Sequence, residues 1–195
     1  MTSPIDRGGA HHPLIELTLT RLREFVREPE ALFWTFVFPI VMAYAAAMDL
    51  LTMTIPNRVS LALVAGFFCT AILGGMAWLD IARHVGIGVA LLALSILMFS
   101  QGWVGGGDAK LLAAAGLWFG FSQVLDYIMT VAIFGGLLSL FILSYRNLIP
   151  SVLVVGHGWA ERLHDKKSGI PYGIALAGAG LWLYPSSDVF RAFWA

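Results

Sequence analysis

Long apolar runs recur along the chain, and short polar connections separate them. A helix that crosses a bilayer needs about 17–25 mostly apolar residues. Runs of about this length, with few or no charges, occupy residues 31–51, 59–79, 86–103, 123–145 and 170–185. The segment 109–122 is shorter and can span only as part of a helix that begins at the glycine-rich stretch before it. The pattern predicts an all-α, polytopic membrane bundle of about six transmembrane helices.

The composition agrees with this pattern. Of the 195 residues, 58% are hydrophobic and 12% are charged, whereas soluble domains average about 25% charged residues. The charged coat of a water-soluble globule is therefore missing, and the lipid bilayer is the expected surrounding. The formal net charge is +0, and no basic patch with interleaved aromatic residues indicates a nucleic-acid partner.

The first thirty residues form a different kind of segment. They contain several arginines and acidic residues, and the apolar residues have the spacing of a short amphipathic helix that lies in the membrane interface. These apolar residues are Leu14, Leu17, Leu22, Phe25 and Val26. The acidic residues and the lack of a small-residue cleavage site argue against a cleavable signal peptide. We therefore expect an N-terminal tail, residues 1–30, and a transmembrane domain, residues 31–195.

The basic residues predict which ends of the spans lie inside the cell. The longest polar connection, residues 144–168, contains several Lys and Arg residues, and such loops tend to stay cytoplasmic. Alternation of the spans then places residues 49–58 and 105–108 at the cytoplasmic face and the connection at residues 80–84 outside. It also places the arginine-containing tail outside, which conflicts with the same rule.

Two aspartates, Asp49 and Asp108, lie at span ends that this topology puts on one face. An Asp at the centre of a membrane helix costs about 2.5–3.5 kcal/mol, so a carboxylate in or beside a span indicates nearby water or a function. Two carboxylates that share a site cannot both ionise easily, and they titrate as a unit. Such a pair holds one proton, so it can activate water and protonate a leaving amine. This is the arrangement of an aspartic peptidase.

The glycines at 105–107 have a physical use beside Asp108. Without side chains, they let the backbone approach a neighbouring helix or an extended substrate closely. A carboxylate in the first turn of the following helix is stabilised by the helix dipole. The residues by themselves leave two alternatives open. Asp108 can be a helix N-cap after a tight turn, and Asp49 can be a span-end carboxylate paired with Arg58.

Three segments match one known family in the right order. The segment "GGGDAKLLAAAG" (105–116) resembles the GxGD motif of the type IV prepilin peptidases, and "AAMDLLTMTIPNRVS" (46–60) resembles the first catalytic segment of that family. The segment "KSGIPYGIALAGAG" (167–180) resembles its last span. The resemblance covers roughly residues 38–185. It implies an integral-membrane aspartic endopeptidase that removes the leader peptide of prepilins at the cytoplasmic face of the bacterial inner membrane.

The resemblance also implies roles for single residues. Asp49 and Asp108 correspond to the catalytic pair of the family. Gly105, Gly107 and Lys110 belong to the motif around Asp108 and support the active site. The resemblance implies that prepilins and pseudopilins are the substrates and that no cofactor is needed. It does not indicate the oligomeric state.

Departures from the larger family members narrow the prediction. Those members carry a cytoplasmic insertion with two CxxC pairs and also N-methylate the new terminus. Here Cys69 is the single cysteine, and the connection after the first span is short, so neither a metal site nor methyl transfer is expected. We expect Cys69 to be buried and inert. The chain thus resembles the small branch that serves Flp-type (tight-adherence) pili.

Two functions of other classes stay open. The segment "LTRLREFVREPEALFWTFVFPIVMA" (19–43) resembles the start of an ABC-2 type transporter permease, which allows a polytopic transport component. A catalytically inactive scaffold for pilus assembly is the third possibility. Transporters are expected to hold polar groups near the bilayer midplane, whereas the acids here cluster at one face. His157 and His164 lie seven residues apart, but no carboxylate at suitable spacing completes a metal site.

Overall fold

The computed structural model describes residues 35–194, apart from residues 151–152, 154–155, 157 and 167. The expected interfacial helix of the tail lies outside the described residues, and the division of the chain at residue 30 stays a prediction. All regular secondary structure in the described ranges is helical.

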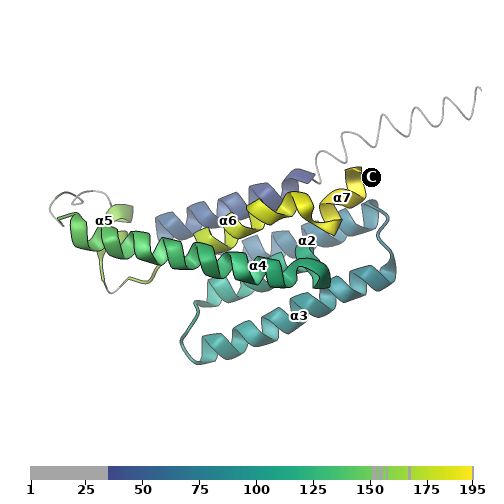
Figure 1. The fold of residues 1–195 in the computed structure, drawn as a ribbon, viewed down its shortest axis with the longest axis horizontal. Helices are drawn as coiled ribbons and strands as arrows, with labels where there is room; N and C mark the ends of the chain where they lie inside the picture. The colour runs from purple at the N-terminus through teal and green to yellow at the C-terminus, as the bar shows by residue number, and fades with distance from the viewer. Residues whose placement is uncertain (1–34, 151–152, 154–155, 157, 167, 195) are drawn as a thin grey trace, which may run out of the picture. The chain divides into compact units, whose positions relative to one another are not determined.

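The described helices follow one another in a simple order (Figure 1). They are the helix Thr35–Thr52, α2 (Asn57–Leu73), α3 (Trp78–Ser100), α4 (Gly106–Leu148), α5 (Gly158–His164), α6 (Gly173–Leu183), the short 3-10 helix η2 (Tyr184–Ser186) and α7 (Asp188–Trp194). Thr35–Thr52, α3 and α4 are long and apolar enough to cross a bilayer. α2 and α6 are apolar but shorter, with 17 and 11 residues. The prediction of an all-α membrane helical bundle is confirmed.

α4 is two helical arms joined by a sharp bend at Gly120. This glycine has φ 59° and ψ −164°, a backbone conformation that L side chains rarely adopt. Phe119 and Tyr127 are eight residues apart, which is about 12 Å along a straight helix, yet their rings stack with centroids 4.6 Å apart. The chain therefore turns back at the bend (Figure 1). The first arm, residues 106–119, and the second arm, residues 121–148, correspond to two of the predicted spans.

The connection between α2 and α3 lies earlier than predicted. It occupies residues 74–77, and the charged residues that we expected in an external loop belong to the first turns of α3. Asp80 and Arg83 form a salt bridge of 2.9 Å within the helix. The buried His84 donates from Nδ1 to the carbonyl oxygen of Leu117 at 2.5 Å. The prediction was wrong because these polar groups find partners on or beside the helix and do not need a loop.

Aromatic side chains form the centre of the bundle around Trp118, which is fully buried. Its ring lies 5.0 Å from that of Phe38, 6.1 Å from Phe67 and 5.9 Å from Tyr184. Its indole N–H donates to the carbonyl oxygen of Leu63 at 3.1 Å. Aromatic pairs of this kind stabilise a fold by about 0.5–1.5 kcal/mol each beyond their burial. The cluster joins Thr35–Thr52, α2, the first arm of α4 and η2.

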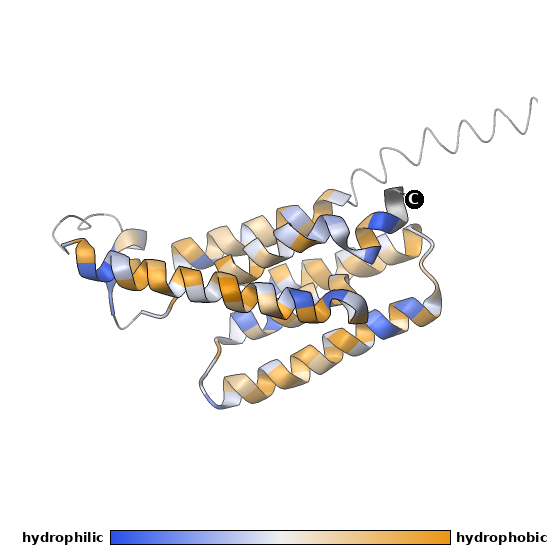
Figure 2. Ribbon diagram, viewed as in Figure 1, coloured by the Kyte–Doolittle hydropathy of each residue, from blue (hydrophilic) through white to orange (hydrophobic). Residues whose placement is uncertain are grey.

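The outside of the bundle is also apolar, as expected for helices in lipid. Figure 2 shows hydrophobic residues along the length of the helices and hydrophilic residues towards their ends. Large exposed side chains include those of Ile40, Leu61, Ile96, Leu97, Leu125 and Phe141. Cys69 is exposed as well, so its predicted burial was wrong. An apolar run does not distinguish lipid-facing from core-facing positions, because both are apolar.

Candidate active site

Asp49 is a buried carboxylate near the end of the helix Thr35–Thr52. The residue is only 5% exposed, and its Oδ2 accepts a hydrogen bond of 2.7 Å from the backbone N–H of Gly173, the first residue of α6. The salt bridges of the described residues do not include one between Asp49 and Arg58, which is exposed. The alternative that Asp49 is held by Arg58 is therefore not what the structure shows.

Asp108 lies in the first turn of the first arm of α4. Gly105 takes the N-cap position, and no side chain caps the helix. Asp108 is thus inside the helix, which excludes the alternative of an N-cap aspartate. A Cβ at Gly105 would lie 3.0 Å from Oδ2 of Asp108, so the glycine leaves room for the carboxylate directly beside the turn.

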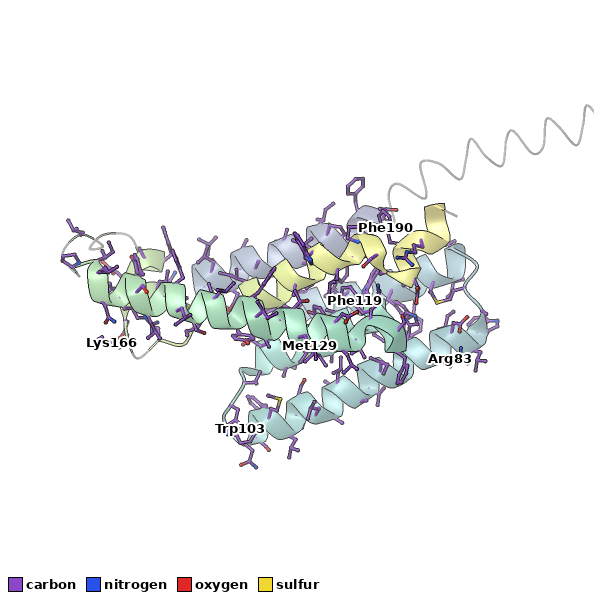
Figure 3. The ribbon with its side chains drawn as sticks, in the orientation of Figure 1. Arg83, Trp103, Phe119, Met129, Lys166 and Phe190 are labelled. Carbon is purple, nitrogen blue, oxygen red and sulfur yellow. The ribbon has the colours of Figure 1, made fainter. Side chains whose placement is uncertain are left out.

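Both carboxylates line one cavity of about 880 Å³. The cavity lies between Thr35–Thr52, α3, the two arms of α4 and the segment that leads into α6. Its walls are mainly apolar and include Leu94, Met98, Trp103, Ile128, Val131 and Leu176. Figure 3 shows Trp103 at the connection between α3 and α4. The structure therefore brings together two aspartates that are 59 positions apart in the sequence.

Two contacts join the segment of Asp108 to the segment that follows Asp49. A Cβ at Gly107 would lie 3.1 Å from Cβ and 3.4 Å from the backbone nitrogen of Ile55, so this glycine lets the two backbones pack closely. Lys110 donates from Nζ to Oδ1 of Asn57 at 2.8 Å. Gly107 and Lys110, two of the residues predicted to support the active site, thus lie where the segment of Asp108 meets the segment that follows Asp49.

A sequence model of the type IV leader peptidase family matches residues 36–144. The chain belongs to this family. The matched residues contain Asp49, Asp108 and the contacts between their segments, which confirms the resemblance found in the sequence. The match ends before α5 and α6, so the amide of Gly173 lies beyond it.

Curated relatives agree with the family. The chain is 26% identical over 185 residues to the prepilin leader peptidase/N-methyltransferase of Aeromonas hydrophila, an alignment that covers 90% of this chain and 58% of that protein. It is 25% identical to the protein of the same name from Aeromonas salmonicida (strain A449), with 90% of this chain and 57% of that protein covered. The chain therefore spans somewhat more than half the length of these relatives. No solved structure matches it.

The described residues contain no group of three or more His, Cys, Asp and Glu side chains that could hold a metal ion. His164, at the end of α5, hydrogen-bonds from Nε2 to the carbonyl oxygen of Ile149 at 2.7 Å. His157 lies outside the described residues. Asp49 and Asp108 are the acidic side chains among the described residues that line the cavity, and this lining includes no His or Cys.

Sequence reasoning missed two parts of the site. The N–H of Gly173 was matched as part of a family segment, but the role of holding Asp49 was not assigned to it. Arg146 is one of the basic residues of the connection 144–168, which were used only to predict the topology, yet it lines the same cavity as the two aspartates. The role of Gly173 could have been suspected from its position at the start of an apolar helix, directly after Pro171 and Tyr172. No residue near Arg146 in the sequence indicated that Arg146 lines the cavity.

Proposed function

We propose that this chain is a membrane-embedded aspartic endopeptidase that cleaves the leader peptide of prepilins, with Asp49 and Asp108 as the catalytic pair. The observation that supports this proposal best is the shared cavity of two carboxylates from separate helices. The curated relatives are named prepilin leader peptidase/N-methyltransferase, which agrees with prepilins as the proposed substrate class.

The chemistry follows from a pair that holds one proton. The ionised carboxylate accepts a proton from a water molecule, which attacks the carbonyl carbon of the scissile peptide bond while the protonated carboxyl donates to the carbonyl oxygen. The bond between carbon and nitrogen then breaks, and the leaving amine takes up a proton from the pair. Apolar walls around the pair exclude bulk water and strengthen these interactions.

We further propose that the substrates are Flp-type prepilins and related pseudopilins. Four residues separate Thr52 from Asn57, so this connection has no room for a cysteine-containing insertion, and the chain has one cysteine. Leader cleavage without methyl transfer is the activity that fits these features.

The proposed location is the bacterial inner membrane, with the active site on the cytoplasmic side. The support is the basic connection that precedes α6. Single cysteines at Thr52 and Gln101, in a Cys69→Ala background, should resist a membrane-impermeant thiol reagent added from outside the cell, whereas a cysteine at Arg83 should react. All three positions are exposed. Reaction at Thr52 or Gln101 from outside would overturn the proposed orientation.

The decisive test is cleavage of a co-expressed Flp-type prepilin, followed by its mobility on an immunoblot. Asp49→Asn and Asp108→Asn should each abolish cleavage while the protein still inserts into the membrane, because an amide can neither accept nor donate the required proton. Asp126→Asn is the matched control, since Asp126 is an exposed carboxylate on the second arm of α4. Normal cleavage by either active-site variant would disprove the assignment of that residue. A folded wild-type protein that cleaves nothing would favour the inactive scaffold instead.

A further inference from the structure

The second arm of α4 holds the segment that leads into α6 through one arginine. Arg146 donates from Nε to the carbonyl oxygen of Leu163 at 2.7 Å. Its Nη2 donates to the carbonyl oxygens of Ser168 and Gly169, both at 3.0 Å. The planar guanidinium presents several donors in a rigid fork, so one side chain binds one backbone carbonyl of α5 and two of the connection between α5 and α6.

The same arm contacts this segment at a second point. A Cβ at Gly135 would overlap the side chain of Tyr172, so the ring of Tyr172 occupies the space that the glycine leaves. Gly135 and Arg146 are 11 residues apart. In an α-helix this is about three turns with an offset of roughly 20°, so both residues lie on one face of the arm.

These two contacts lie directly before the amide that binds Asp49. Gly169 is held by Arg146, Tyr172 is held at Gly135, and the next residue is Gly173, whose N–H donates to Oδ2 of Asp49 at 2.7 Å. Pro171, between them, restricts the backbone further. The second arm of α4, which supplies neither carboxylate, therefore contacts the residues that directly precede this amide.

A second arginine attaches the same connection to the helix of Asp49. Arg162, in α5, donates from Nη2 to the carbonyl oxygen of Leu51, two residues after Asp49. Cations at the carbonyl end of a helix are favourable. Arg162 thus contacts the helix of Asp49, while Arg146 contacts the segment that precedes the amide donor of Asp49.

We propose that Arg146 is a positioning residue for the reaction. It holds residues 168–173 in place, so that the N–H of Gly173 meets the carboxylate of Asp49. This inference rests on the proposed peptidase function, and it assigns a mechanistic role to a side chain that does not belong to the GxGD motif or to the segment around Asp49.

Because Arg146 also lines the cavity, direct contact with the substrate is the competing explanation, and kinetics separate the two. If a residue binds the substrate equally strongly in the ground state and in the transition state, its removal raises KM and leaves kcat unchanged. A misplaced Asp49 lowers kcat. We therefore expect Arg146→Met to lower kcat about 10-fold or more, with KM within about twofold of the wild-type value.

Two further variants sharpen the test. Arg146→Lys keeps the charge but cannot reach three carbonyls with one planar group, so it should recover only part of the lost rate. Arg83→Met, which removes an exposed arginine paired with Asp80 on α3, should cleave normally. In a Gly173→Ala background, Arg146→Met should cause little additional loss, because both changes remove the same interaction.

Hydrogen–deuterium exchange in detergent gives a readout that does not depend on cleavage. The backbone of residues 168–176 should exchange several-fold faster in Arg146→Met than in the wild type, and Arg83→Met should leave it unchanged. Unchanged exchange in Arg146→Met, a rise in KM alone, or fully additive losses with Gly173→Ala would each overturn the inference. If the wild type cleaves no prepilin, the proposed function fails, and the exchange data still decide whether Arg146 holds this segment.

Discussion

The hydrogen bond from Gly173 to Asp49 leads to a quantitative prediction for Gly173→Ala. A Cβ at this position would lie 2.8 Å from both Oδ2 of Asp49 and Cδ1 of Ile55. These distances are too short for real contacts, so either the carboxylate or the start of α6 must shift. A shift of either one breaks the 2.7 Å hydrogen bond.

The size of the effect follows from the type of bond. A hydrogen bond to a charged group contributes about 1.5–3 kcal/mol, and each 1.36 kcal/mol is a factor of ten in rate. If the bond holds Asp49 in its reactive position, Gly173→Ala should lower kcat/KM for prepilin cleavage by about 10- to 100-fold. Replacing glycine by alanine, where alanine can adopt the backbone conformation, stabilises a protein by about 0.4–1 kcal/mol through the lower entropy of the unfolded chain, which offsets part of the steric cost. The fold should therefore persist.

The assay is initial-rate cleavage of a purified prepilin in detergent, together with the thermal unfolding of each variant. Gly169→Ala is the matched control, because it changes a glycine of the same segment where a Cβ would meet nothing within 4 Å. Wild-type rates for a folded Gly173→Ala would refute the reasoning. Equal losses for Gly169→Ala would show that any change in the segment is harmful, and that the contact with Asp49 is not the cause.

Three other expectations can be checked with the same preparations. Lys110→Met should lower the rate of cleavage by up to about tenfold, because it removes the hydrogen bond from the Lys110 ammonium to Asn57. A hydrogen bond from a charged donor contributes about 1.5 kcal/mol. Unchanged rates would show that this bond is not needed. Gly120→Ala should lower the unfolding temperature, because the bend needs positive φ and a Cβ would lie 2.6 Å from the His84 ring; an unchanged temperature would contradict this. A chelator should leave cleavage unchanged, since the proposed chemistry uses carboxylates and water; loss of activity that added zinc restores would point to the region of His164 instead.

Much of the candidate site could be predicted because its residues stand in short local motifs. The glycines at 105–107, Asp108 and Lys110 are contiguous, and Asp49 lies a few residues before an Ile-Pro-Asn segment. Short motifs of this kind can be read without knowing how the helices pack. Arg146 has no such context, because its partners are backbone carbonyls 17 to 23 residues away, and any residue type can supply a carbonyl.

The sequence by itself determined the class of fold and the candidate carboxylates. Apolar runs of bilayer length leave few alternatives to membrane helices, because every backbone polar group in lipid must be satisfied within a helix or a closed barrel. Only the tertiary structure decided where α3 begins, that Cys69 faces outward, and that the N–H of Gly173, 124 positions along the chain, holds Asp49. The physical reason is that core and lipid-facing surfaces are equally apolar, and contacts between distant segments depend on packing that no local pattern encodes.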